Sequence, residues 1–165
     1  MNTSHGKLLH PPIVEAVLDV DCDMPPAFGL ALMQKPLSEA FQDQYPKSHV
    51  LFLEEARIEQ EVDQPIQVSA QQRLQSLQFL KEDGKQLIQV RMQGFSFNRL
   101  APYTTLDDYL PEIKRVWGLF ATIVAPIQIR AVRLRYINRI VLPLTDGRVE
   151  IKNYLKIGPS LPDED

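Results

Sequence analysis

Three arginines near the C-terminal end of the chain have the types and spacing that most directly suggest chemistry. Arg133, Arg135 and Arg139 occupy odd positions of the run 131–142. Successive side chains of a strand point to opposite faces, so these groups would share one face, with the nearest two about 6–7 Å apart. Guanidinium groups bind phosphate or carboxylate in a bidentate manner. Together with the adjacent Asn138 they form a candidate anion-binding site.

The same run predicts the strand that would carry these side chains. Apart from Asn138, its even positions are apolar: Val132, Leu134, Tyr136, Ile140 and Leu142. Such alternation is typical of a half-buried strand, so we expect the even face to meet the core. A buried Asn138 amide would need hydrogen-bond partners. It is therefore either a site residue or, in the interpretation we favour, a structural amide near the end of the strand.

A second alternating run, residues 13–21, carries Glu15, Asp19 and Asp21 on its polar face. If the two runs pair, these carboxylates lie opposite the arginines, and cross-strand opposite charges contribute roughly 0.2–1 kcal/mol per pair. Arg91 on a third strand would extend the row. The arginines are thus either half of an ion-pair ladder or a ligand site, and we favour the ladder because the acidic and basic rows match.

Other reactive side chains do not form recognisable sites. His5, His10 and His49 lack a second ligand at metal-binding spacing. Cys22 lies beside two aspartates that would raise its pKa, which disfavours a reactive thiolate. We therefore predict no catalytic residue, no metal and no cofactor.

An acidic cluster precedes the middle of the chain and comprises Glu54, Glu55, Glu59 and Glu61. Paired carboxylates can hold Mg²⁺ or act as acid and base. We prefer a solvated sheet edge.

Composition restricts the class of protein. The chain has 165 residues, enough for one core, and a net charge of −3, which gives no general attraction to nucleic acid or anionic membranes. One cysteine excludes an internal disulfide. Without a signal peptide or an apolar run of roughly 20 residues, we expect a soluble cytoplasmic protein. We predict a tail over 1–10, one domain over 11–156, and a tail over 157–165, where the chain is either naturally short or truncated from a longer chain.

The elements that must position these residues follow a simple order. A helix is predicted from Pro25-Pro26 up to Tyr45-Pro46, with a kink or a break into two short helices at Pro36. A second, strongly amphipathic helix follows Thr104 or Thr105 as cap, starts its regular part at Pro111 after an initial turn, and ends at Ala125. Between them, Asp83-Gly84 predicts a two-residue hairpin turn joining strands 74–81 and 86–93. Gly94 suggests a bulge or bend. Residues 47–71 are ambiguous, with 50–62 forming an extra edge strand or a short helix.

This order predicts an α+β protein with a ferredoxin-like βαββαβ fold, a mainly antiparallel sheet and two helices on one face. The first and last strands would be antiparallel neighbours, with the last at the edge. Trp117 and Phe120 would pack against Leu134, Tyr136 or the first strand.

Four short motifs also support this segmentation: Pro12-Ile13-x-Glu15-Ala16, Tyr45-Pro46, Phe97-Asn98-x-Leu100-x-Pro102-Tyr103 and Leu134-Arg135-Tyr136-Ile137-Asn138-Arg139-Ile140. Together they resemble a sporadically distributed prokaryotic family of uncharacterised proteins, over residues 11 to 156. The resemblance implies no activity.

Two function hypotheses remain. The first is a non-enzymatic binding or interaction module that forms a homo-oligomer or binds another protein. The second is a phosphate- or nucleotide-handling enzyme in which the arginines hold an anionic substrate. We favour the first, and expect no membrane or nucleic-acid partner, while a small anionic ligand stays open.

Overall fold

The computed structural model describes residues 12–59, 67–144 and 147–149. Its elements, in chain order, are β1 (Ile13–Asp23), α1 (Leu30–Phe41), β2 (Lys47–Glu59), β3 (Gln67–Leu80), β4 (Gln86–Arg91), β5 (Gly94–Leu100), α2 (Leu106–Val124) and β6 (Gln128–Asn138). The tails predicted at 1–10 and 157–165 lie outside these residues, as does Glu61.

All six strands form one antiparallel sheet in the order β2-β3-β4-β5-β1-β6. The chain is α+β, but its order β-α-β-β-β-β-α-β makes the ferredoxin-like prediction wrong. The predicted pairing of the first and last strands is confirmed, with β6 at the edge. Two strands account for the difference: β2, which the sequence left ambiguous, and β5, which it did not predict.

The hairpin around Gly84 differs from the predicted two-residue turn. Lys81 N–H donates to Gln86 O at 3.0 Å, so four residues, 82–85, form the connection. Gly84 does have positive φ, +66°, as predicted. The two-residue turn lies instead between β4 and β5, where Arg91 pairs with Gly94 across Met92 and Gln93.

Gly94 therefore begins a strand directly after a turn, so of the two predicted alternatives the chain bends here and has no bulge. Its φ is +152°, and a Cβ placed there would lie 2.0 Å from Val20 O on the neighbouring strand β1. Only glycine allows the two backbones to approach this closely. The turn has no Asn-Gly or Asp-Gly signal, so the sequence did not reveal it.

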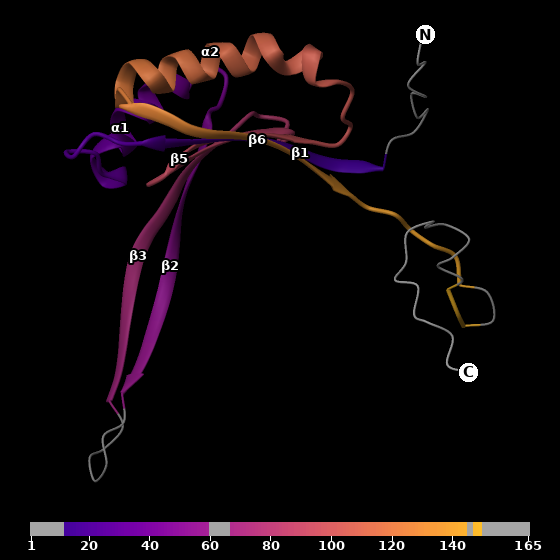
Figure 1. Ribbon diagram of the computed structural model, residues 1–165, viewed down its shortest axis with the longest axis horizontal. Coiled ribbons are helices and arrows are strands. Elements are labelled where there is room, and N and C mark those ends of the chain that lie inside the picture. Colours follow the sequence, from indigo (N-terminus) through magenta and orange to yellow (C-terminus); the bar gives the residue numbers. More distant parts are fainter. Residues whose placement is uncertain (1–11, 60–66, 145–146, 150–165) are drawn as a thin grey trace, which may run out of the picture.

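Both helices lie on one face of the sheet (Figure 1) and cover its middle strands. α1 contacts β3, α2 contacts β5, and the helices contact each other. Each continues through its internal proline, Pro36 or Pro111, without the predicted interruption. Thr105 is the cap of α2, and its backbone N–H donates to Asp108 Oδ2 at 3.2 Å.

The core lies between the helices and the sheet. Phe120 is completely buried, and its ring packs against Phe95 and Trp117, with centroids 5.3 Å away in each case. Its predicted burial is confirmed, but its sheet partner is β5. Leu134 and Tyr136 on β6 stay 39% and 43% exposed because the helices do not extend over the edge strand.

The β2–β3 hairpin forms an arm that projects from the body on the side opposite the helices (Figure 1). A register shift between Leu51 and Phe52 places an extra residue, Gln75, in β3. Such bulges bend the strand that carries them. β3 pairs with β4 only from Ser76 onward, so the hairpin beyond the bulge has no other strand beside it among the described residues.

Candidate functional site

The face of the sheet opposite the helices carries an ion-pair ladder centred on Asp19. Arg135 donates to Asp19 Oδ2 through Nε at 2.9 Å and Nη2 at 2.6 Å, and Arg91 Nη2 donates to Oδ1 at 3.1 Å. Asp19 is only 5% exposed. The predicted pairing of β1 carboxylates with β6 arginines is thus confirmed, and Arg91 does extend the row.

Two further pairs continue the ladder toward the start of β6. Arg133 Nη1 donates to Asp21 Oδ2, and Arg91 Nη2 lies 3.6 Å from Asp21 Oδ1. Arg130 Nε donates to Asp23 Oδ2 at 2.7 Å. Arg130 was not predicted as a member of the ladder, because it precedes the run 131–142. A register shift between Asp21 and Cys22 leaves Arg130 unmatched in the pairing and turns it toward Asp23.

The other predicted members lie apart from the ladder. Glu15 accepts a hydrogen bond from Asn98 Nδ2 at 2.6 Å and has no arginine partner in the described part of the chain. Asn138 is the last residue of β6 and is exposed, so the expectation of a buried amide was wrong. Arg139 follows the strand end, with its backbone N–H donating to Pro12 O at 2.8 Å.

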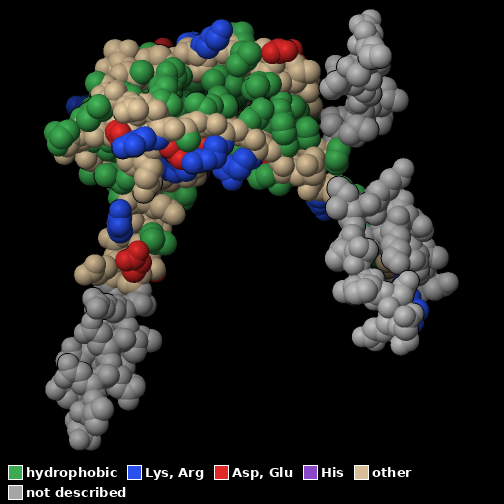
Figure 2. All heavy atoms as spheres, viewed as in Figure 1, with side chains coloured by type: hydrophobic (Ala, Val, Ile, Leu, Met, Phe, Trp, Pro, Cys, Tyr) green, Lys and Arg blue, Asp and Glu red, His purple; other side chains and the backbone are tan. Residues whose placement is uncertain are grey.

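The observed ion pairs favour the ladder over a ligand site as the interpretation of the arginines. Arg130, Arg133 and Arg135 each hold a carboxylate of β1, so their positive charge is compensated within the sheet. Figure 2 shows basic side chains along the concave lower side of the body, with acidic groups between them. An anionic ligand would have to compete with carboxylates already in place. The face therefore offers an anion little net attraction.

β6 also presents a second surface, on the helix side. Its exposed apolar side chains are Val132, Leu134 and Tyr136, with Ile127 and Ile129 preceding them. Val132, Leu134 and Tyr136 are among the residues predicted to meet the core. They are paired with β1 but lie outside the area that α1 and α2 cover. Hydrophobic side chains accordingly form the band above the basic row in Figure 2.

The backbone edge of β6 is open as well. Arg139 N–H points toward β1, where it bonds to Pro12 O. Backbone groups alternate in direction along a strand, and β6 keeps a continuous register with β1 from Ile137 to Ala131. The N–H and C=O groups of Val132, Leu134 and Tyr136 therefore point outward. No strand lies beyond β6 in the described sheet to accept them.

A tyrosine cluster fixes one end of this edge. The Tyr136 hydroxyl lies 3.2 Å from that of Tyr103, and their rings are 5.4 Å apart. Tyr103 in turn packs against Tyr109 of α2, at 5.7 Å. Partial burial and the hydrogen bond with Tyr136 raise the pKa of Tyr103, so its hydroxyl stays neutral at physiological pH. The cluster holds Tyr136 in a defined position beside the open edge.

The opposite edge, β2, has features that discourage strand pairing. It bends at the bulge, and Glu54 and Glu55 on its arm are exposed. Bulges and charged side chains are the usual protection of sheet edges. The preference for a solvated edge over a metal site at these glutamates agrees with their position. β6 has no proline between Gln128 and Asn138, and its outward apolar row is uncharged.

Potential metal ligands and the single cysteine can be placed in the parts of the chain that the structure describes. No three His, Cys, Asp or Glu side chains there lie close enough to hold a metal ion. Cys22 is buried, and burial together with Asp21 and Asp23 raises the pKa of its thiol, the direction that the sequence predicted. In the described residues, no helix is long and apolar enough to cross a membrane.

Comparisons with family models, with curated proteins and with solved structures find no match to this chain.

Proposed function

We propose that this protein is a binding and interaction module that self-associates by pairing strand β6 with β6 of a second copy. The open backbone edge, bordered by exposed Val132, Leu134 and Tyr136, carries the proposal. An unprotected edge with apolar side chains on one face is a template for another strand. Pairing with an identical strand closes the assembly at two copies.

The sequence of β6 is complementary to itself in one antiparallel register. With the twofold axis at Leu134, the outward groups of Leu134 bond to Leu134 of the second copy, and Val132 lies opposite Tyr136. Apolar side chains therefore meet on the helix side at all of these positions. Aromatic and β-branched side chains form favourable cross-strand pairs.

The arginines on the other face tolerate this arrangement. In the same register Arg133 lies opposite Arg135 of the second copy, and like charges directly opposite would destabilise the pair. However, Arg133 is bonded to Asp21 and Arg135 to Asp19, so both guanidinium groups are compensated and drawn toward β1. The ladder thus supports association because it compensates the positive charge along β6. Among the described residues, no contact on this face favours the phosphate-handling enzyme.

The mass of the protein in solution tests the proposal. Sedimentation velocity of the full chain over a wide concentration range should show a dimer. Val132→Lys and Leu134→Lys should each shift the equilibrium to monomer, because a dimer would place a lysine within the apolar row. Leu32→Lys is the matched control. Leu32 is a 68% exposed leucine on α1, away from the edge, and its substitution should leave the dimer intact.

A second variant separates loss of pairing from loss of folding. Leu134→Pro removes an outward N–H that β1 does not use, and proline is tolerated at sheet edges. It should give a monomer with an unchanged circular dichroism spectrum. A monomer mass for the unmodified protein at every concentration would refute the proposal, as would a dimer that survives both Leu134 substitutions.

A further inference from the structure

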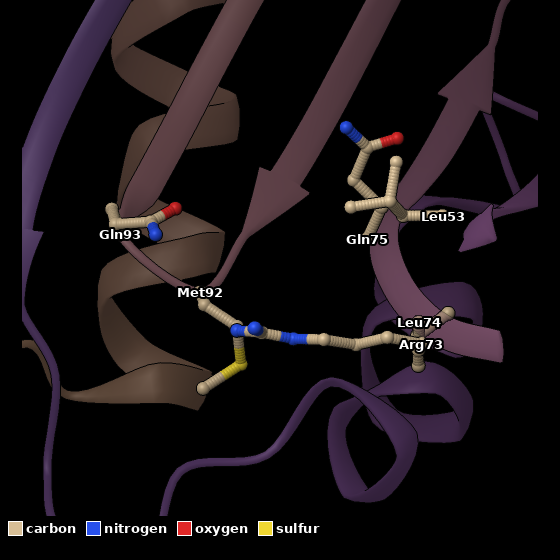
Figure 3. A pocket seen from close by; sticks show the side chains of 6 residues that line it. All are labelled: Leu53, Arg73, Leu74, Gln75, Met92 and Gln93. Carbon is tan, nitrogen blue, oxygen red and sulfur yellow. The ribbon is translucent and has the colours of Figure 1, made fainter. Parts of the chain in front are cut away.

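At the bend between arm and body, the structure has a pocket of about 220 Å³. Leu53, Arg73, Leu74 and Gln75 line it from the base of the arm, and Met92 and Gln93 from the turn between β4 and β5. Figure 3 shows the Arg73 side chain extended toward Met92 across the space between these elements. The pocket thus lies between the base of the arm and the β4–β5 turn, which the sheet links through β3.

Arg73 differs from the arginines of the ladder. The structure gives it no carboxylate and no hydrogen-bond acceptor among the described residues, whereas Arg91, Arg115 and Arg135 all hold carboxylates. The Arg73 side chain is exposed and extends toward Met92, so the guanidinium group is accessible to an anion that enters the pocket. Arg73 therefore supplies a strong donor at the wall of a pocket, with no partner among the described residues.

The remaining lining residues restrict the chemistry of an occupant. Gln75 and Gln93 add amide N–H donors to the lining, and three of the lining residues are apolar: Leu53, Leu74 and Met92. A lining that combines polar donors with hydrocarbon suits an amphipathic anion. Inorganic phosphate would leave the apolar walls unused, and a neutral apolar molecule would leave Arg73 unpaired.

We propose that this elbow pocket binds a small carboxylate with an apolar body. Arg73 would bind the carboxylate in bidentate fashion, the two glutamine amides would donate to it, and the apolar part would pack against Leu53, Leu74 and Met92. The ligand would then link the base of the arm to the β4–β5 turn. This site is separate from the β6 edge and does not depend on self-association.

Methyl NMR with benzoate tests the proposal. Benzoate should shift the Met92 methyl signal in a saturable way and leave Met24 and Met33, which pack at the core, unchanged. Benzyl alcohol, similar in shape but neutral, and inorganic phosphate should produce no saturable shift at Met92. Arg73→Gln should weaken benzoate binding about tenfold or more. Arg139→Gln removes another exposed arginine and is the matched control, with unchanged binding.

Three results would overturn the proposal. They are the absence of a saturable benzoate shift, equal shifts from benzyl alcohol or phosphate, and undiminished binding by the folded Arg73→Gln protein. Repeating the titration on Leu134→Lys should give the same affinity. A loss of binding in that variant would show that the site requires the paired form and would contradict its independence.

Discussion

At the residue scale, we predict that removing an arginine from the ladder costs less stability than removing the aspartate at its centre. Arg135 is more than half exposed, whereas Asp19 is buried and accepts hydrogen bonds from two arginines. Removing Arg135 leaves Asp19 paired with Arg91, so Arg135→Ala should lower the free energy of unfolding by about 0.2–1 kcal/mol. Asp19→Ala leaves the partly buried Arg91 without its main partner and should cost about 3 kcal/mol. Urea denaturation of both variants measures the difference, and equal losses would contradict this account.

A second residue-scale feature joins the end of α1 to α2. Tyr45 is 1% exposed, and its hydroxyl donates to Glu112 Oε1 at 2.8 Å, while Arg115 donates to both oxygens of Glu112 at 2.8 Å. Tyr45→Phe keeps the ring in the core and removes one bond to a charged acceptor. We expect a loss of about 1.5–3 kcal/mol in the free energy of unfolding. An unchanged urea midpoint would show that this bond adds nothing to stability.

The same carboxylate predicts a dependence on pH. Burial raises the pKa of Glu112, but the hydrogen bonds from Arg115 and Tyr45 outweigh it and bring the pKa below its ordinary value of 4.5. The carboxylate therefore stabilises the fold above the unfolded-state pKa, and this contribution is lost as the pH falls through the lower, folded-state pKa. The difference in unfolding free energy between the unmodified protein and Glu112→Gln should be largest near neutral pH. It should shrink below about pH 4.5, and a difference independent of pH would contradict the assignment.

At the scale of the elements, substitution by alanine is predicted to have opposite effects on stability at two glycines. Gly94→Ala would force a Cβ against Val20 O, at a φ that side chains rarely adopt, and should destabilise the β1–β5 pairing by about 3 kcal/mol or more. Gly118 lies within α2 with no atom near its Cβ position, so Gly118→Ala should stabilise by about 0.5–1 kcal/mol. Thermal unfolding of both variants tests the pair. A tolerated Gly94→Ala would mean that the strands can separate locally.

The sequence predicts the elements whose one face is buried. β1 alternates clearly, α2 has a continuous apolar stripe and a capping residue, and both were found close to their predicted bounds. β2 gave no such signal because most of its described side chains are exposed on both faces. β5 does alternate, with Phe95 and Phe97 buried against the helices, but the turn before it has no recognisable sequence. Periodicity reports burial, so strands without a buried face cannot be found from it.

The candidate site was predictable only in part, for a related reason. The charge ladder follows from matching two alternating strands, and the sequence contains both. The same alternation suggested that Val132 and Leu134 belong to the core. Whether a helix reaches the edge strand depends on how many strands the sheet has, and the ambiguous strand β2 and the unpredicted strand β5 changed the answer. The elbow pocket depends on the bulge at Gln75, which no local pattern indicates.

At the scale of the whole molecule, the arm is predicted to be dispensable for folding. Leu53 pairs with Arg73, so replacing residues 54–72 by Asn-Gly would close the hairpin at that pair. The trimmed protein should unfold in one cooperative transition with nearly unchanged stability, because the removed segment pairs only with itself in the described sheet. Trimming further, through Leu74, should destabilise the body, since Leu74 packs against the core. Comparable losses from both deletions would show that the arm supports the fold.

The direction of the arm has a consequence for the proposed pair. Antiparallel pairing within one continuous sheet requires a twofold axis perpendicular to that sheet, so both sets of helices lie above it and both arms descend below it. β2 and β6 are opposite edges, which places the arms at the two far ends of the joined sheet. The pair would therefore have a concave face, with one arm at each end and the ion-pair ladders of both copies between the arms. This concave face could enclose a rod-shaped partner, and it would exist only in the pair.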